Sequence, residues 1–515
     1  MNWNKFQIGL IILFISVVST NAQDSNFWGN LKPGPFTPGF KLIEAKDHSR
    51  FYPSHTIETQ NARPIRVYIW YPALKSTQPP LRFASFVRMA AEDFVPESGK
   101  PDEKLQKEIL PVPLAKGLQP DRLNVILDSR TASVQDAEPA EEIFPLLILG
   151  QGLYYESPLS HFILCEFLAS HGYVVATCPL LGTQYRLVNI KVEDLETQIR
   201  DLEFVITQAR IQPFVHPERM GVIGYDLGGM AGLVLSMRNP DIDAFLSMDS
   251  GILFGHFSGL PGNHPQYLEK RFTIPWMHMT QARIIQTFRD EQGISTLFGR
   301  KSYGDSYLVP VPTSNHGHFT SYAMLDIRDA VPGYWGPVES DPKPLYEAIS
   351  RYALSFFNAY LKQDNQELES LHRIAQDKES SASLLKLEWK KGQEPPLSEA
   401  DFIHLIIEKG LSAARDVIRQ EKATYPGEVL IDESVLNWLG YHFLYWWGRE
   451  EEAVEVFKLN VSLFPESANT HDSLGEAYLN RGQTNLAIQS YEKSLELNPD
   501  NANAASILKR LKKKK

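Results

Sequence analysis

Six short apolar runs between residues 144 and 314 constrain the fold of this chain most strongly. The runs are FPLLILG (144–150), YVVATC (173–178), MGVIGYD (220–226), DAFLSMD (243–249), IPWMHM (274–279) and SYLVPVPTS (306–314). Each run is continuously apolar, and helical sequence lies between the runs, including an amphipathic stretch at about 191–210. Strands that are buried on both faces have this character. The sequence therefore predicts an α/β fold, with a mostly parallel sheet covered by helices on both faces.

The rest of the N-terminal part is arranged around this predicted sheet. The stretch RPIRVYIWYPA, which begins at Arg63, alternates as a strand does. Residues 73–143 are polar and weakly periodic, which predicts an insertion with one or two helices and a role as one wall of a cleft. A helix at 344–363 is expected to close the domain, which gives a domain over residues 23–375 and a linker over residues 376–400.

Beyond about residue 400 the pattern changes to helices alone and repeats with a period of 34 residues. Four positions in one copy recur in the next, namely Gly448, Ala453, Phe457 and Pro465, followed by Gly482, Ala487, Tyr491 and Pro499. This period and these residue types are typical of tetratricopeptide repeats. We expect repeats over residues 401–515, with clear copies at 433–466 and 467–500 and a divergent first hairpin at 401–428. Such repeats present a concave surface to a protein or peptide partner, and a self-packing or dimer contact is the alternative.

The N-terminus has the pattern of a cleavable secretory signal. One lysine precedes an apolar run from Ile8 to Val18, and small and polar residues follow up to Ala22. We therefore expect a signal peptide over residues 1–22 and an exported protein, periplasmic or secreted. No later segment approaches 18 uninterrupted apolar residues, so no membrane span is expected.

Charge and cysteine content exclude some classes of protein. The formal net charge of −11 argues against a nucleic-acid partner. Only two cysteines are present, which excludes a small fold framed by disulfides. Cys165 falls in a predicted helix and Cys178 at the end of a predicted strand. We expect two buried free thiols, and a bridge between them stays open.

The stretch GYDLGG, residues 224–229, has the sequence pattern of a nucleophile elbow. Gly224, Gly228 and Gly229 lack the Cβ that would clash in a sharp strand-to-helix turn. The nucleophile position is occupied by Asp226. A tight turn without chemistry is the alternative for this motif taken alone.

Other polar or turn residues follow the predicted strands that flank this turn. The segment Gln151-Gly152-Leu153 ends the first apolar run, where the backbone N–H of Leu153 is a candidate oxyanion donor, together with that of Leu227. Asp249 ends the strand after the elbow and is the candidate acid. His316 and His318 follow the last apolar run and are candidates for the general base. The order of nucleophile, acid and histidine along the chain is that of the α/β-hydrolases.

These motifs make the resemblance specific. Residues from about 30 to 375 resemble the platelet-activating-factor acetylhydrolase branch of the α/β-hydrolases, which is related to dienelactone hydrolase-like proteins. The matching pieces are GPFTPGFKLIEAKDHSR, RPIRVYIWYPA, FPLLILGQGL, VIGYDLGG, LSMDSGI and SNHGHF. The resemblance implies Asp249 as the acid, and it implies His316 as the base in preference to His318 because Phe319 follows three residues later. The chain departs from that family at Gln151, where histidine is usual, and at Asp226, where serine is usual.

Three functions are compatible with aspartate at the elbow. The first, which we expect, is a hydrolase of carboxylic esters or related small lipids or xenobiotics, with Asp226 as nucleophile or as base for a water; the other two are alternatives. The second is a hydrolase of epoxide or carbon–halogen bonds that forms an ester on Asp226, as in haloalkane dehalogenases and epoxide hydrolases, which the arrangement resembles. The third is a non-catalytic protein that binds a partner through its repeats. We expect a small-molecule substrate for the first two, no cofactor and no metal.

Overall fold

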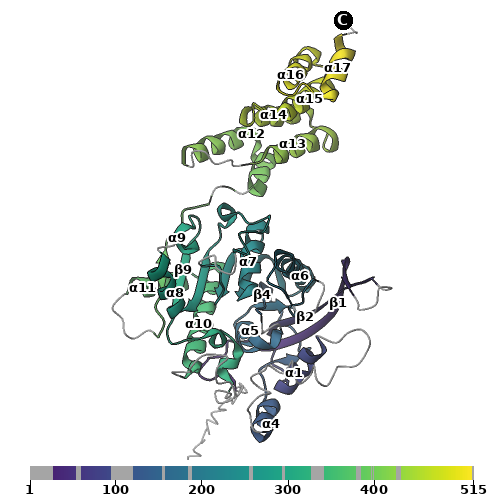
Figure 1. Cartoon of the computed structure of the whole chain (residues 1–515). Coiled ribbons are helices and arrows are strands. Elements are labelled where there is room, and N and C mark those ends of the chain that lie inside the picture. Colours follow the sequence, from purple (N-terminus) through teal and green to yellow (C-terminus); the bar gives the residue numbers. More distant parts are fainter. Residues whose placement is uncertain are drawn as a thin grey trace, which may run out of the picture. The chain divides into compact units, whose positions relative to one another are not determined.

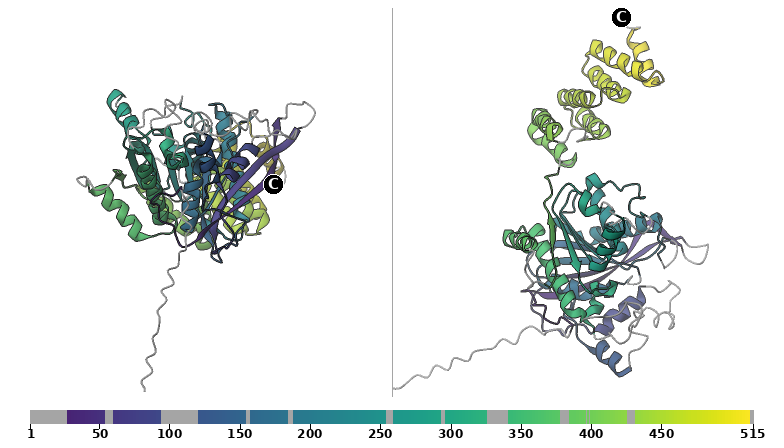
Figure 2. Two further views of the ribbon diagram at one scale, coloured as in Figure 1. Left: turned by 90° about the horizontal axis from the view of Figure 1, so that it is seen from below. Right: turned by 60° about the vertical axis from the view of Figure 1, so that its left-hand side comes forward.

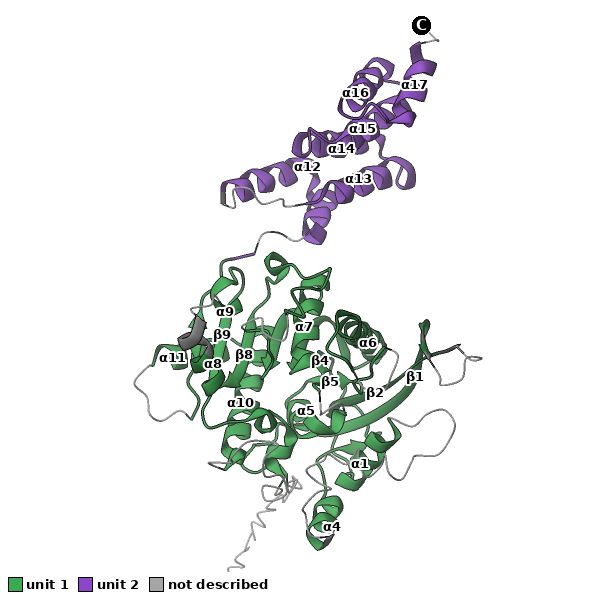
Figure 3. Cartoon of the chain, in the orientation of Figure 1, with its two compact units in different colours: residues 1–393 green, residues 394–515 purple. Residues whose placement is uncertain are grey.

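A computed structural model describes residues 27–53, 60–93, 120–153, 157–183, 188–253, 259–292, 296–325, 341–377, 384–395, 397, 399–424 and 431–512. The chain divides into two compact units, residues 1–393 and 394–515 (Figure 3). The expected signal peptide, residues 1–22, lies outside the described residues, and its assignment stays a prediction.

The first unit is built on one ten-stranded sheet (Figure 1). Its strands are β1 (Thr37–Pro53), β2 (Gln60–Ala73), β3 (Val134–Gln135), β4 (Phe144–Gly150), β5 (Val174–Thr177), β6 (Val215–Tyr225), β7 (Ala244–Met248), β8 (Trp276–Gln281), β9 (Ser306–Val311) and β10 (Glu388–Lys390). They lie in the order β10-β9-β8-β7-β6-β4-β5-β2-β1-β3. The strands from β5 to β9 pair in parallel, whereas β2 is antiparallel to both β1 and β5, and β10 is antiparallel to β9. The predicted parallel sheet is confirmed.

Helices cover both faces of this sheet (Figure 2). They are α1 (Phe83–Glu92), α4 (Pro120–Asp128), α5 (Phe162–Ser170), α6 (Val192–Arg210), α7 (Leu227–Arg238), α8 (Ala282–Gln292), α9 (Leu297–Arg300), α10 (Pro342–Leu361) and α11 (Asn365–Gln376), with 3-10 turns η1 (Pro158–His161), η2 (Glu269–Arg271), η3 (His316–Phe319) and η4 (Ser321–Met324). Residues of α1, α5 and α10 form one core, and residues of α6 and α7 form the other. Strand β4 shows why its sequence is continuously apolar: Leu147 and Leu149 enter the first core, while Leu146 and Ile148 enter the second.

One expected boundary differs from the structure. The segment expected as a linker, residues 376–400, contains β10, whose residues Glu388–Lys390 pair with β9. The first unit therefore continues past α10 and α11 to residue 393 and does not end at 375. The expected insertion, residues 73–143, contains α1 and α4 as predicted, and it also supplies β3, which pairs with β1. Its residues 94–119 lie outside the described part of the chain.

The second unit consists of helices. They are α12 (Glu399–Thr424), α13 (Glu433–Tyr441), the π-helical turn η6 (His442–Trp446), α14 (Glu450–Leu463), α15 (Ala468–Asn480), α16 (Thr484–Leu497) and α17 (Ala502–Lys512). The pairs α13–α14 and α15–α16 correspond to the two predicted repeat copies. The divergent hairpin predicted at 401–428 corresponds to α12, which is interrupted at Gly410, where φ is 80°.

The repeat pattern has a packing reason. Phe457 and Tyr491 occupy the same place in successive copies, and both are fully buried. A Cβ on Gly440 would lie 2.6 Å from the Phe457 ring, and one on Gly475 would lie 3.1 Å from the Tyr491 ring. Each large ring thus packs against a helix position that lacks a side chain, which explains why the pattern recurs.

Within the described residues, no helix is both long enough and apolar enough to span a bilayer. Both cysteines are buried and free, as expected for Cys165 and Cys178.

Candidate active site

The turn between β6 and α7 holds Asp226 in a strained backbone conformation, with φ 49° and ψ −115°. Glycine allows the close approach of chain segments here, because a Cβ on Gly228 would lie 2.1 Å from the carbonyl oxygen of Gly150. The Asp226 N–H donates to the Met248 carbonyl at 3.1 Å, and its own carbonyl accepts the Ser250 hydroxyl at 2.7 Å. The predicted elbow is therefore present. The hydrogen bonds to Met248 and from Ser250 stabilise its strained backbone conformation.

Both predicted oxyanion donors converge on the carboxylate of Asp226. The Leu153 N–H donates to Asp226 Oδ2 at 2.9 Å, and the Leu227 N–H donates to the same side chain. The approach of the Leu153 segment requires Gly152, where a Cβ would lie 2.7 Å from Asp226 Cβ and 2.7 Å from the Tyr225 ring. The Leu153 amide, which a serine hydrolase would offer to a substrate oxygen, thus holds an oxygen of the protein itself.

Gln151 anchors the segment that carries Leu153. Its side-chain amide donates to Thr177 Oγ1 at 2.8 Å, and its backbone carbonyl accepts Gln198 Nε2 at 2.8 Å. Gln151 is buried. Its side chain therefore fixes the backbone beside the elbow.

Asp249 follows β7 and is buried at the carboxyl edge of the sheet. Its carboxylate accepts Thr280 Oγ1 at 2.9 Å and Gln281 Nε2 at 2.7 Å, and it pairs with His316 Nδ1 at 2.7 Å. Burial by itself raises the pKa of Asp249, but the hydrogen bonds and the charge of His316 outweigh burial, so the pKa lies below its ordinary value. Asp249 is therefore held as a carboxylate beside the imidazole.

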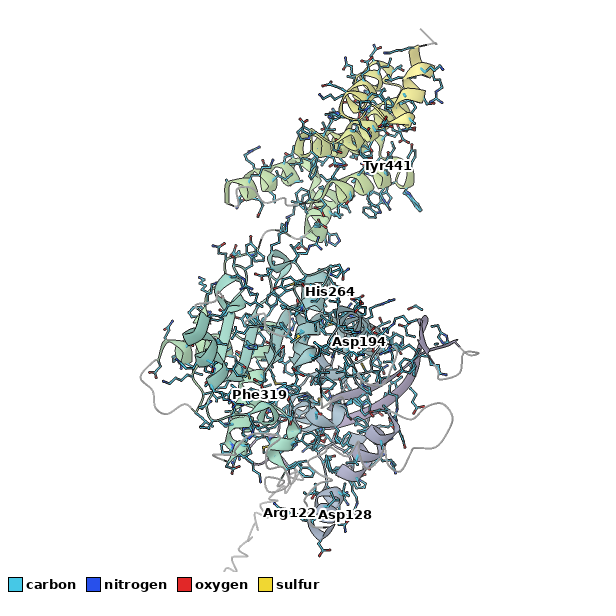
Figure 4. The ribbon with its side chains drawn as sticks, in the orientation of Figure 1. Arg122, Asp128, Asp194, His264, Phe319 and Tyr441 are labelled. Atoms are coloured by element: carbon cyan, nitrogen blue, oxygen red, sulfur yellow. The ribbon has the colours of Figure 1, made fainter. Side chains whose placement is uncertain are left out.

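The structure brings His316, and not His318, to the acid. His316 lies in η3, and its side chain is 33% exposed. Burial lowers the pKa of His316, while Asp249 and Asp226 raise it, and the net direction is upward. His318 instead accepts the Asn315 N–H at 3.2 Å and caps η3, and burial lowers its pKa to about 4. Phe319, which marks this turn in the sequence, is fully buried (Figure 4).

Asp226 lies in the electrostatic field of the same pair. Burial raises the pKa of Asp226, whereas the charge of His316 and the amides of Leu153 and Leu227 counteract burial, and the net direction is upward. Asp226, Asp249 and His316 thus form one constellation at the carboxyl edge of the sheet, where the sequence predicted it.

Sequence reasoning missed two aromatic residues beside this constellation. The Tyr225 ring stacks on His316, with centroids 4.7 Å apart and planes at 25°, and its hydroxyl donates to the His316 carbonyl at 3.0 Å. His161 contacts the Tyr225 ring edge-on at 5.0 Å. Tyr225 adjoins the nucleophile position in the motif GYD, which was a usable signal, whereas His161 has no spacing that distinguishes it from a core histidine.

No metal site accompanies this constellation in the described ranges. There, no group of three or more His, Cys, Asp and Glu side chains lies close enough together to hold a metal ion. Neither does the elbow precede a Lys-Ser or Lys-Thr pair of the kind that cradles phosphate.

The second unit has a cavity of its own, of about 270 Å³. It lies between α15, α16 and α17 and is lined by Glu476, Leu479, Asn480, Tyr491, Asn503, Ile507 and Arg510. The Tyr491 hydroxyl is buried and has no hydrogen-bond partner among the described residues. The Asn480 amide already donates to the Tyr445 hydroxyl and the Glu476 carbonyl, and the Asn503 amide donates to Asp472. The Arg510 guanidinium is the charged donor in the lining.

The strand order, the elbow between β6 and α7 and the histidine after β9 define the first unit as an α/β-hydrolase fold. The second unit contains a tetratricopeptide repeat, since that family matches at residues 473–501. A solved structure similar to the chain is a ferulic acid esterase from Streptomyces cinnamoneus, with 20% sequence identity, a TM-score of 0.48, and coverage of 69% of this chain and 97% of that chain. Among curated proteins, no sequence matches this chain significantly.

Proposed function

We propose that the protein is a hydrolase in which Asp226 is the nucleophile and attacks a saturated carbon of an epoxide or a carbon–halogen bond. One observation carries the proposal: Asp226 Oδ2 accepts the Leu153 N–H at 2.9 Å, and the Leu227 amide acts on the same side chain. A carboxylate oriented in this way has its second oxygen left for attack. The amides can then stabilise the charge that develops on Asp226 itself when its ester is cleaved.

The same observation argues against ester cleavage by acyl transfer. In that reaction the two amides bind the carbonyl oxygen of the substrate, and here the Asp226 carboxylate occupies the Leu153 amide. Attack of a carboxylate on an ester carbonyl also gives a mixed anhydride, which is higher in energy than the ester. Esters are therefore tested separately from epoxides and haloalkanes.

The reaction proceeds in two balanced steps. The free oxygen of Asp226 forms a bond to the substrate carbon, and the carbon–oxygen or carbon–halogen bond breaks. Its electron pair leaves on halide, or on the epoxide oxygen, which takes a proton from water. His316, oriented by Asp249, then takes a proton from water, and the hydroxide attacks Cγ of Asp226. The negative charge passes to the oxygen held by Leu153, the bond between Cγ and the ester oxygen breaks, and His316 returns its proton to the alkoxide, which leaves as alcohol. Asp226 then releases its carboxyl proton to solvent water, which restores the carboxylate.

We also propose that the first unit belongs to the acetylhydrolase and dienelactone hydrolase-like branch of this fold, and that the protein is exported to the periplasm or secreted. The motifs from GPFTPGF to SNHGHF support the branch, and the apolar run from Ile8 to Val18 supports export. N-terminal sequencing of the protein purified from its native host tests export, with cleavage after Ala22 as the expected result. A mature protein that starts at Met1 contradicts it.

A panel of esters, epoxides and haloalkanes tests the activity on wild type, Asp226→Ala and Asp226→Ser side by side. We expect turnover of an epoxide or haloalkane by wild type alone. Intact-mass analysis of His316→Gln with the best substrate should show a covalent adduct, because removal of a general base slows the second step by about 10² to 10⁴-fold. Turnover that survives in Asp226→Ala rejects the proposal. A wild type inert to the whole panel, with ester cleavage gained by Asp226→Ser, favours a non-catalytic role.

For the second unit we propose the binding of an extended peptide at the cavity between α15 and α17. The side-chain carbonyl oxygens of Asn480 and Asn503 suit the N–H groups of a bound backbone, and Arg510 suits a carboxylate. A peptide array probed with full-length wild type and with Arg510→Glu tests this. Peptides that bind wild type and lose binding to the variant are expected, and equal binding by both contradicts the proposal.

A further inference from the structure

Tyr225 holds His316 at two points. Its ring stacks on the imidazole with centroids 4.7 Å apart and planes at 25°, and its hydroxyl donates to the His316 backbone carbonyl at 3.0 Å. The two residues are 91 positions apart in the chain, so this contact ties the end of β6 to the loop after β9. The first contact orients the side chain of His316, and the second fixes the backbone from which it projects.

The Tyr225 ring is itself held in place. It is fully buried, and the backbone of Gly152 lies so close that an added Cβ would be 2.7 Å from the ring. The edge-on contact from His161, at 5.0 Å and 65°, supports the ring further. A ring with so little freedom is a rigid platform for its neighbour.

We propose that Tyr225 is a positioning residue that sets the orientation of His316 towards Asp249 and favours the protonated imidazole through its π face. This role rests on the proposed function of His316 as general base. A protonated imidazole forms in the second step, when His316 has taken the proton from water. The face of an aromatic ring attracts such a cation.

The other charged or titratable groups that face His316 come from three elements. Asp249 follows β7 and Asp226 follows β6, and both raise the pKa of His316. His161 in η1 is neutral at working pH because burial lowers its pKa to about 3. Its two ring nitrogens have no hydrogen-bond partner in the described part of the chain. The two carboxylates act on His316 irrespective of Tyr225, so the effect of the ring is measurable against a constant background.

NMR titration of His316 in full-length protein tests this role without requiring turnover. In Tyr225→Leu the stack is lost, and we expect the titration midpoint of His316 to fall by about 0.5 pH, the equivalent of an exposed cation–π contact. In Tyr225→Phe the stack remains and the hydroxyl is lost. The midpoint should then stay near that of wild type, while the Nδ1 proton resonance of His316 broadens because its loop moves more freely.

Tyr71→Phe is the matched control. Tyr71 is also a buried tyrosine, and its hydroxyl donates to a backbone carbonyl, that of Ala137, at 2.7 Å. Its loss should leave the His316 spectrum unchanged. An unaltered midpoint in folded Tyr225→Leu together with an unbroadened resonance in Tyr225→Phe overturns the proposal, and so does a spectrum of Tyr71→Phe that changes as much. If Tyr225→Leu does not fold, the His316 Nδ1 proton resonance in Tyr225→Phe is the test: broadening supports the proposal, and an unbroadened resonance overturns it.

The outcome for Tyr225 can be distinguished from the outcome for the proposed function. A shifted midpoint in a protein inert to every substrate shows a positioning contact without the proposed chemistry. An unshifted midpoint in an active enzyme rejects the role of Tyr225 alone. In an active enzyme, kcat should fall in Tyr225→Leu with KM unchanged, because the fully buried ring is not accessible to substrate.

Discussion

Replacing Asp249 by asparagine is expected to destabilise the first unit in a pH-dependent way. The carboxylate accepts Thr280 Oγ1 at 2.9 Å and Gln281 Nε2 at 2.7 Å and pairs with His316 Nδ1 at 2.7 Å. Asparagine has one acceptor oxygen, and its NH₂ group would face another donor. A hydrogen bond to a charged group is worth about 1.5 to 3 kcal/mol, so we expect the free energy of unfolding to fall by about 2 to 3 kcal/mol at pH 5.

The pH dependence follows from His316, whose pKa is raised in the fold by Asp249 and Asp226 against the lowering effect of burial. A raised histidine pKa contributes stability that is fully present below the unfolded value of 6.5 and is lost as the pH rises through the folded value. Asp249→Asn removes most of this contribution. Its penalty should therefore shrink by about 1 kcal/mol at pH 9, where His316 is neutral while the carboxylate still accepts its hydrogen bonds from Thr280 and Gln281.

Urea unfolding at pH 5 and pH 9, followed by hydrogen exchange in peptides from β6 to β8, measures the first unit alone. Asp194→Asn is the matched control (Figure 4). Asp194 is also buried, and it accepts the Thr183 N–H at 2.9 Å and the Asn189 N–H at 2.6 Å. Its pKa is lowered, because hydrogen bonds outweigh burial, and no histidine is among the causes. The loss in free energy of unfolding caused by Asp194→Asn should be the same at both pH values. A penalty for Asp249→Asn that is equally insensitive to pH would refute the reasoning.

Three further predictions concern activity. Gly152→Ala would place a Cβ 2.7 Å from Asp226 Cβ, so kcat in steady-state assays should fall by about 100-fold. Gly299→Ala is the control, because its Cβ would lie 3.5 Å from the nearest atom, and kcat should stay unchanged. The pKa values of Asp226 and His316 are both raised, the first by burial and the second by Asp249 against burial. Asp226 acts deprotonated in the first step and His316 in the second, so kcat should fall as the pH drops through these values, and a profile that rises towards acid contradicts the roles. Asp226→Ser frees the backbone donors and should cleave p-nitrophenyl acetate about 10-fold faster than wild type; no gain would show that the amides alone do not form an oxyanion hole.

The sequence predicted the sheet and the site through the same property. Strands buried on two faces are continuously apolar, and the carboxyl ends of parallel strands meet at one edge of a sheet. Asp226, Asp249 and His316 follow three such strands, so their proximity could be expected from the sequence alone. Choosing His316 over His318 needed a family pattern, because both side chains lie on the same short loop.

Other features had no signal in the sequence. The strand β10, Glu388–Lys390, is a short, half-buried edge strand, so it lacks the apolar run that marks the central strands. The bond from Leu153 N to Asp226 Oδ2 depends on the rotamer of one side chain, which no pattern specifies. The stack of Tyr225 on His316 joins residues 91 positions apart. Such contacts are tertiary, and periodicity reports only on local structure.

Isotope labelling of Asp226 tests the central claim most directly. Wild type is incubated over many turnovers in ¹⁸O-water with the best epoxide or haloalkane from the panel, and its proteolytic peptides are weighed by mass spectrometry. If water attacks Cγ of an ester on Asp226, one oxygen of the carboxylate is replaced in each cycle, and the peptide containing Asp226 must gain ¹⁸O. A peptide that stays unlabelled while the product alcohol carries ¹⁸O would show direct attack of water on the substrate, and would contradict the account.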